Sequence, residues 1–98
     1  MRFEWDEEKS RRNLAKHKIG FENASLVFED PLALSVQDRE VEGEERWQTL
    51  GTVSGTVLIV AHTYRDEKGD EVIRLISARR ASARERRAYA KSQKRSGG

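Results

Sequence analysis

The sequence predicts one α+β domain, with N-terminal helices packed on a four-stranded antiparallel sheet, a short N-terminal strand and a basic C-terminal helix. Three observations predict this class. Apolar residues recur at helical spacing before Pro31, and between residues 32 and 78 they recur with the period of strands. Beyond residue 82, Ala, Arg and Glu dominate, which are good helix formers. The 98 residues can bury one modest core.

The first thirty residues predict a short edge strand and two helices. Residues 2–5 alternate between polar and apolar side chains, as a strand does. Asp6 is a suitable N-cap for a helix that continues to about Lys18, and Gly20 is the expected stop. A second short helix should end before Pro31, because the residue preceding a proline is pushed out of the helical region.

Four strands connected by short turns are expected next, in the order of a meander. The expected strands are residues 32–37, 46–53, 56–64 and 72–78. A charged connection at residues 38–44, the turn at Ser54-Gly55 and a hairpin loop at residues 66–70 separate them. The strand at 56–64 is the most apolar and is expected at the centre of the sheet.

The last part of the chain predicts a basic helix that docks weakly. Ser82 precedes Glu85 by three residues, which is the spacing of a capping box. Tyr89 is the one large apolar side chain that this helix offers to a core. Residues 91–98 have no pattern and are expected to be a disordered tail, so the predicted domain is 1–90.

The composition excludes several classes of protein. The chain has no cysteine, two histidines and no motif of a nucleotide-binding loop or zinc protease, so we expect no metal and no cofactor. The longest apolar run, residues 57–61, is too short to cross a membrane, and the N-terminus has no signal-peptide pattern. We therefore expect a cytoplasmic protein without membrane contact.

Charge is distributed unevenly along the chain. Residues 72–98 contain nine basic side chains and one acidic one, whereas residues 1–71 contain ten basic and sixteen acidic ones. A basic segment on an otherwise acidic protein favours a polyanionic or acidic partner over a merely solvated surface.

Arginine side chains are the first candidates for a functional site, because guanidinium groups fit phosphate oxygens. Arg79 lies where the last strand passes into the helix, a better-fixed position than the tail. The other predicted phosphate contacts are Arg65, Arg74, Arg80, Arg86 and Lys16. The alternative is that several of these arginines pair with the acidic stretch 40–45.

His62 and Tyr89 are the candidates for proton transfer. His62 titrates near neutral pH, although a lone histidine in an apolar strand is more often a packed, hydrogen-bonded residue. Tyr89 can stack on a base or hold a phosphate oxygen, but an anchor in the core is the slightly favoured reading.

The register of the last hairpin decides which arginine meets His62. A three-residue loop places His62 opposite Arg74, with Arg80 on the same face of the sheet. A two-residue turn at Lys68-Gly69 places His62 opposite Leu75 and gives it a face shared with Arg79. The sequence leaves both alternatives open.

These side chains suit the cleavage of RNA without a metal ion, because the 2′-hydroxyl lies beside the scissile phosphate. His62 and Tyr89 would move protons and Arg79 would hold the developing charge, which makes these three the predicted catalytic residues. The alternatives are a nucleic-acid-binding module without catalysis and a protein-interaction domain that uses the basic helix.

The order of these residues resembles the BrnT family of toxins from type II toxin–antitoxin operons. The matching positions are Phe3, Trp5, Asp6, Lys9, Asn13, Lys16, His17, Phe21, Ala24, Phe28, Asp30, Pro31, Arg46, Gly51, His62, Thr63, Arg65, Ile76, Ser77, Arg79, Ala81, Glu85, Arg86 and Tyr89.

The resemblance implies a RelE-like fold and a ribonuclease that inhibits translation. It also implies a cognate BrnA-like antitoxin, in a heterotetramer that contacts DNA through the antitoxin alone.

Overall fold

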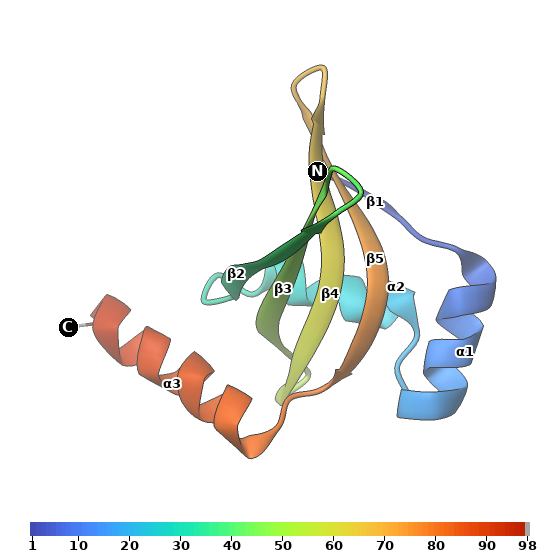
Figure 1. Ribbon diagram of the computed structural model, residues 1–98. Coiled ribbons are helices and arrows are strands. Elements are labelled where there is room, and N and C mark those ends of the chain that lie inside the picture. Colours follow the sequence, from blue (N-terminus) through green and yellow to red (C-terminus); the bar gives the residue numbers. More distant parts are fainter. Residues whose placement is uncertain (98) are drawn as a thin grey trace.

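The computed structural model describes residues 1–97, with side chains described as far as residue 93. In chain order its elements are β1 (Arg2–Glu4), α1 (Glu7–His17), α2 (Phe21–Ala24), the 3₁₀ helix η1 (Ser25–Glu29), β2 (Leu34–Val41), β3 (Glu44–Val53), β4 (Thr56–Glu67), β5 (Asp70–Arg80) and α3 (Ala83–Gly97). The strands form one sheet in the order β1-β5-β4-β3-β2 (Figure 1).

The sheet has five strands and is mixed, which corrects the expected four-stranded antiparallel sheet. Strands β2 to β5 form the expected antiparallel meander. Strand β1 adds to the edge of β5 in parallel, with Phe3 opposite Ile73. Alternation in the sequence identifies a strand but not its partner. The parallel pairing therefore follows from the path of the chain through α1 and not from residues 2–5 themselves.

Three tight turns hold the meander together. Each has two central residues with positive φ, the second a glycine: Glu42-Gly43, Ser54-Gly55 and Lys68-Gly69. Such turns match the right-handed twist of the strands that they join. The expected charged connection at residues 38–44 is therefore mostly strand, because the turn needs only Glu42 and Gly43.

The N-terminal helices differ in detail from the expectation. Asp6 caps α1 as predicted, accepting hydrogen bonds from the amides of Glu8 (2.8 Å) and Lys9 (3.2 Å). The helix ends with Lys18 in the left-handed conformation (φ 65°), two residues before the predicted glycine. The second helix is split into α2 and η1, and there Val27 packs directly on the backbone of Gly51.

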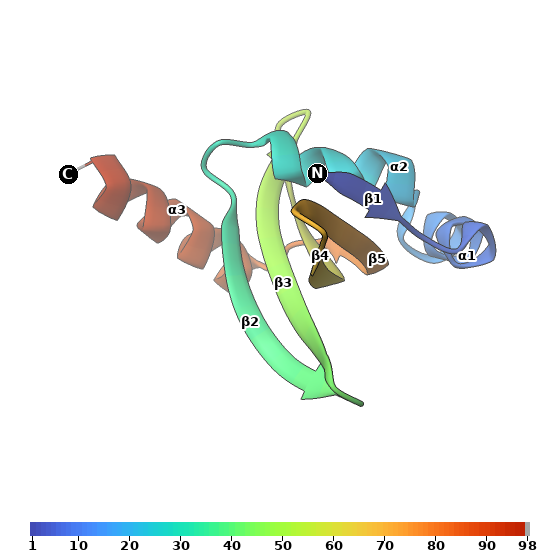
Figure 2. The ribbon, with the colours of Figure 1, turned by 90° about the horizontal axis from the view of Figure 1, so that it is seen from above.

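The main core lies between the sheet and α2 and η1. Phe21, Ala24 and Val27 are fully buried there against Val60 and Leu75. Figure 2 shows α2 on one side of the sheet and α1 beside its β5 edge, where Asn13 hydrogen-bonds the backbone of Ala78, whereas α3 leaves on the other side. We call the side under α2 and η1 the covered face.

A smaller core lies on the opposite face, where α3 begins. Tyr89 and Ala81 pack there against Leu50 and Ile59. Helix α3 then extends away from the sheet (Figure 1). It runs to Gly97, so residues 91–97, expected as a tail, are helical in backbone, and Gly98 lies outside the described residues.

Among residues 1–97, no helix is both long enough and apolar enough to cross a membrane.

Candidate functional site

A β-bulge in β5 decides which side chains share a face. The turn at Lys68-Gly69 has two residues, and His62 lies opposite Leu75, as one of the two alternatives predicts. Between Ala61 and His62 the register shifts by one residue, because Ile76 is left without a partner. The shift places Arg79 opposite Ile59, on the face away from His62.

The face opposite the covered face carries an aligned set of polar side chains. We call it the open face and define it by Arg46, Gln48, Ala61, Thr63, Arg74, Ser77 and Arg79. At its centre Arg46, Thr63 and Arg74 are direct neighbours on β3, β4 and β5. Two arginines are thereby placed on either side of one threonine.

Three buried polar atoms in this row have no hydrogen-bond partner among the described residues: Nε of Arg46, Nε of Arg74 and Oγ1 of Thr63. The Thr63 side chain is almost completely buried, at 1% exposure. Buried polar atoms are rarely left unpaired, and they are often found where a ligand binds. Arg74 also forms a short ion pair with Glu44 on β3.

The N-terminus of α1 borders the same row. Asp6 and Lys9 line a polar hollow of about 220 Å³ together with Arg46 and Arg74. The sequence did not mark Arg46 or Lys9 as candidate site residues. The alternation along β3 put Arg46 on a face, but only the register with β4 and β5 puts it beside Arg74.

Arg79 is held at the other end of the open face. Its guanidinium donates two hydrogen bonds to the carboxylate of Glu85, at 2.8 and 2.9 Å. That carboxylate also accepts from the amide of Ser82, which forms the predicted capping box. The hydrogen bond from Arg79 is the main reason why the pKa of Glu85 falls to about 2. A small hollow of about 50 Å³ between Gln48, Ser77 and Arg79 lies beside this pair.

His62 lies on the covered face and is 3% exposed. Its Nδ1 lies 3.0 Å from the carbonyl oxygen of Thr63, and its Nε2 lies 2.7 Å from Oγ1 of Thr49. The ring also packs edge-on against Phe28. Burial lowers the pKa of His62, so the ring is neutral at pH 7.

Tyr89 is a core anchor, the reading that the sequence slightly favours. It is 6% exposed, and its hydroxyl donates a short hydrogen bond to Asp30 and accepts one from Thr52 at 3.0 Å. Burial, together with the bond to Asp30, raises the pKa of Tyr89. This hydroxyl fastens α3 to the loop after η1 and to β3.

The remaining predicted contacts are dispersed. Arg65 pairs with Glu4 and Glu67 near the last hairpin. Arg80 lies opposite Leu58, Arg86 donates to the carbonyl oxygen of Ala81, and Lys16 is exposed in the last turn of α1. The structure thus brings Arg74 and Arg79 onto one face with Arg46 and Lys9. It does not bring His62 to them.

The described residues contain no group of three or more His, Cys, Asp or Glu side chains arranged to hold a metal ion. A sheet face lined by arginines, with unpaired polar atoms at its centre, is typical of proteins that bind a phosphodiester backbone.

A comparison with known protein families identifies the family to which the chain belongs. Residues 5–85 match the family described as "Ribonuclease toxin, BrnT, of type II toxin-antitoxin system". Because the match covers most of the chain, the chain belongs to the BrnT family of ribonuclease toxins. No curated protein matches the sequence.

Proposed function

We propose that the open face holds the scissile phosphate of an RNA strand and that the protein cleaves the RNA without a metal ion. The observation that carries the proposal is the row of Arg46, Thr63 and Arg74, with its three unpaired polar atoms. Arg79 extends the row toward α3. Loss of cellular RNA would then inhibit translation.

The reaction that suits this face is an internal transesterification. The 2′-oxygen of the ribose attacks the adjacent phosphorus, the bond to the 5′-oxygen breaks, and the products are a 2′,3′-cyclic phosphate and a 5′-hydroxyl. The proton lost by the 2′-hydroxyl goes to a base, and the leaving oxygen gains one. Guanidinium groups stabilise the extra negative charge on the phosphorus oxygens as it develops.

Carboxylates are the proton acceptors at this face. Glu44 lies against Arg74, and Asp6 lines the same hollow. Both ring nitrogens of His62 and the hydroxyl of Tyr89 already have partners away from the row. We therefore assign these two predicted catalytic residues to support of the sheet and of α3, and we assign Arg46, Arg74 and Arg79 to contacts with the phosphate backbone, Arg46 and Arg74 at the scissile phosphate.

A cognate antitoxin of the BrnA kind is the proposed protein partner, in a toxin–antitoxin heterotetramer that reaches DNA through the antitoxin. The proposal is supported by membership of a type II toxin family. An antitoxin segment with acidic side chains that covers Arg74 and Arg79 would neutralise the toxin by occupying the phosphate site.

Arg74→Ala and Arg79→Ala test the site directly. Each removes one fixed cation, so we expect cleavage of single-stranded RNA to fall about 100-fold in each variant. Arg12→Ala is the matched control, because Arg12 is an exposed arginine on α1 paired only with Glu8. Cleavage is measured by the appearance of 2′,3′-cyclic phosphate ends, in the presence of EDTA.

Equal activity in all three variants would refute the open face as the active site. Tight binding of RNA without products would favour the alternative, a binding module without catalysis. Activity that EDTA abolishes would refute the metal-independent reaction.

A further inference from the structure

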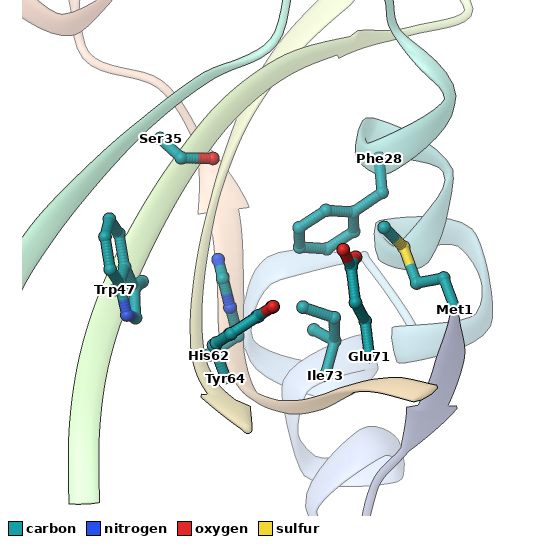
Figure 3. Close-up of a pocket in the computed structure, with 8 residues that line it drawn as sticks. All are labelled: Met1, Phe28, Ser35, Trp47, His62, Tyr64, Glu71 and Ile73. Carbon is teal, nitrogen blue, oxygen red and sulfur yellow. The ribbon is translucent and has the colours of Figure 1, made fainter. Parts of the chain in front are cut away.

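A third hollow lies on the covered face, near the end of the sheet that carries the last hairpin. It measures about 320 Å³, which is within the range of pockets that bind a side chain or a small molecule. The rings of Phe28, Trp47 and Tyr64 form its walls, and Ser35, His62 and Glu71 are its polar residues. Figure 3 shows the Tyr64 hydroxyl and the Glu71 carboxylate pointing into the same space. We call it the aromatic pocket.

The hydrogen bonds beside the pocket leave the Ser35 oxygen able only to accept a hydrogen bond from a ligand. A carbonyl oxygen only accepts, so Nδ1 of His62 donates to Thr63, and Nε2 of the neutral ring accepts from the Thr49 hydroxyl. Thr49 has then used its proton, so Ser35 donates to Thr49 at 2.8 Å. The Ser35 oxygen keeps only lone pairs for a ligand. A ligand that contacts Ser35 or the Glu71 carboxylate must therefore bring donors.

The charge around the pocket is negative. Glu71 takes part in no ion pair within the described part of the chain, and its charge is the main reason why the pKa of Tyr64 is raised. Asp66 and Glu45 add to the same effect. The nearby cations are already paired. Arg2, Arg65 and the N-terminal ammonium contact Glu4, Glu67 and Asp70.

We propose that the aromatic pocket binds an arginine side chain from a basic segment of a partner protein. A guanidinium group stacks on aromatic rings, pairs with a free carboxylate such as Glu71 and donates hydrogen bonds to acceptors such as Ser35. Trp, Tyr and Arg are also the residues that contribute most to protein–protein binding. An RNA strand is disfavoured here, because its phosphates would approach Glu71, Asp66 and Glu45.

This interaction is separate from RNA cleavage. The pocket lies on the covered face, whereas Arg46, Arg74 and Arg79 lie on the open face. A partner can therefore hold the protein through the aromatic pocket whether or not the open face is catalytic. Loss of binding at the pocket should leave cleavage unchanged.

The two tryptophans give a direct test by ¹H–¹⁵N NMR of the full chain. Trp47 lines the pocket, and Trp5 packs beside the main core with its indole N–H on Glu7, so its signal is an internal control. The probe is the blocked peptide acetyl-Ala-Ala-Arg-Ala-Ala-amide, compared with the same peptide containing citrulline, a neutral analogue of arginine. We expect the arginine peptide to shift the Trp47 indole signal and to leave that of Trp5 in place.

We expect binding about fivefold weaker for the citrulline peptide, and for the arginine peptide with Glu71→Gln, because each change removes one charge of the pair. Glu22→Gln, an exposed change on α2, should bind like the unmodified chain. RNA cleavage by Glu71→Gln should equal that of the unmodified chain, so the two proposals fail independently.

Four results would overturn the proposal. Equal shifts with both peptides, or an unchanged affinity in Glu71→Gln, would remove the role of charge. A larger shift with a 2′-O-methyl uridine hexanucleotide would make the pocket an RNA site. A shift that depends only on protein concentration would mean that a second copy of the chain occupies it.

Discussion

At the scale of single residues, His62 shows how burial changes the role that a titratable side chain can perform. The sequence left two roles open, proton transfer and packing. The ring is 3% exposed, both nitrogens are paired, and Phe28 packs against it in a T-shaped contact. Transferring a proton at this position would break the hydrogen bond between His62 on β4 and Thr49 on β3. The environment therefore favours a structural role.

The pH dependence of stability tests that role. Burial lowers the pKa of His62 below 6.5, its ordinary value, so the unfolded chain binds the proton more readily than the folded one. Stability should therefore be level above pH 7 and should fall below about pH 6.5, by up to about 1.4 kcal/mol per pH unit. His62→Gln should reduce this slope. Urea unfolding at pH 7, 6 and 5 measures it.

Two outcomes would contradict the structural role of His62. One is an identical pH dependence in His62→Gln and the unmodified chain. The other is a fully folded His62→Gln protein that has lost cleavage, which would return His62 to the catalytic residues.

At the scale of elements, the close contact of β3 with η1 explains a glycine in the middle of a strand. A Cβ at Gly51 would lie 2.8 Å from the Cβ of Val27 and 2.9 Å from its carbonyl oxygen. Both groups are in the main core, where little movement is possible. The glycine therefore allows η1 to pack closely against the covered face of the sheet.

Gly51→Ala should therefore destabilise the fold by about 1–3 kcal/mol, as overpacking does in other cores. Gly20→Ala is the control, because its Cβ would meet only Ser10 Oγ, at an ordinary 3.7 Å. Thermal unfolding should give a clearly lower Tm for Gly51→Ala alone. Equal Tm values in the two variants would mean that η1 moves away from the sheet without loss.

Helix α3 depends on a few polar contacts, because it has almost no apolar surface to bury. Glu85 fastens its first turn to Ser82 and Arg79, and Tyr89 fastens the next turn to Asp30. The low pKa of Glu85, about 2, keeps this carboxylate charged throughout the physiological range. Glu85, which completes the capping box at the start of the helix, thus also fixes the direction of Arg79.

At the scale of the whole molecule, the two faces of the sheet have opposite chemistry. The open face presents Arg46, Arg74 and Arg79, whereas the aromatic pocket on the covered face is lined by Glu71, with the charges of Asp66 and Glu45 acting on its Tyr64. An RNA strand and a basic protein segment would thus be attracted to different sides of the molecule. The net charge of +2 conceals this separation.

The salt dependence of RNA binding should report the number of phosphates that the open face contacts. For single strands each neutralised phosphate contributes about −0.7 to the slope of log affinity against log salt, so three arginines should give a slope near −2. Arg74→Ala should reduce its magnitude by about 0.7. Fluorescence anisotropy with 2′-O-methyl RNA measures it. An unchanged slope in Arg74→Ala would mean that Arg74 contacts no phosphate.

The sequence by itself determined the element order, the cap at Asp6, the capping box of Ser82 and Glu85, the turn at Ser54-Gly55 and the family, because these depend on neighbouring residues or on residue order. The tertiary structure decided the parallel pairing of β1, the bulge at Ile76 and the placement of Arg46 beside Arg74. Pairing and register depend on contacts between residues far apart in the chain, and one unpaired residue exchanges the two faces of a strand.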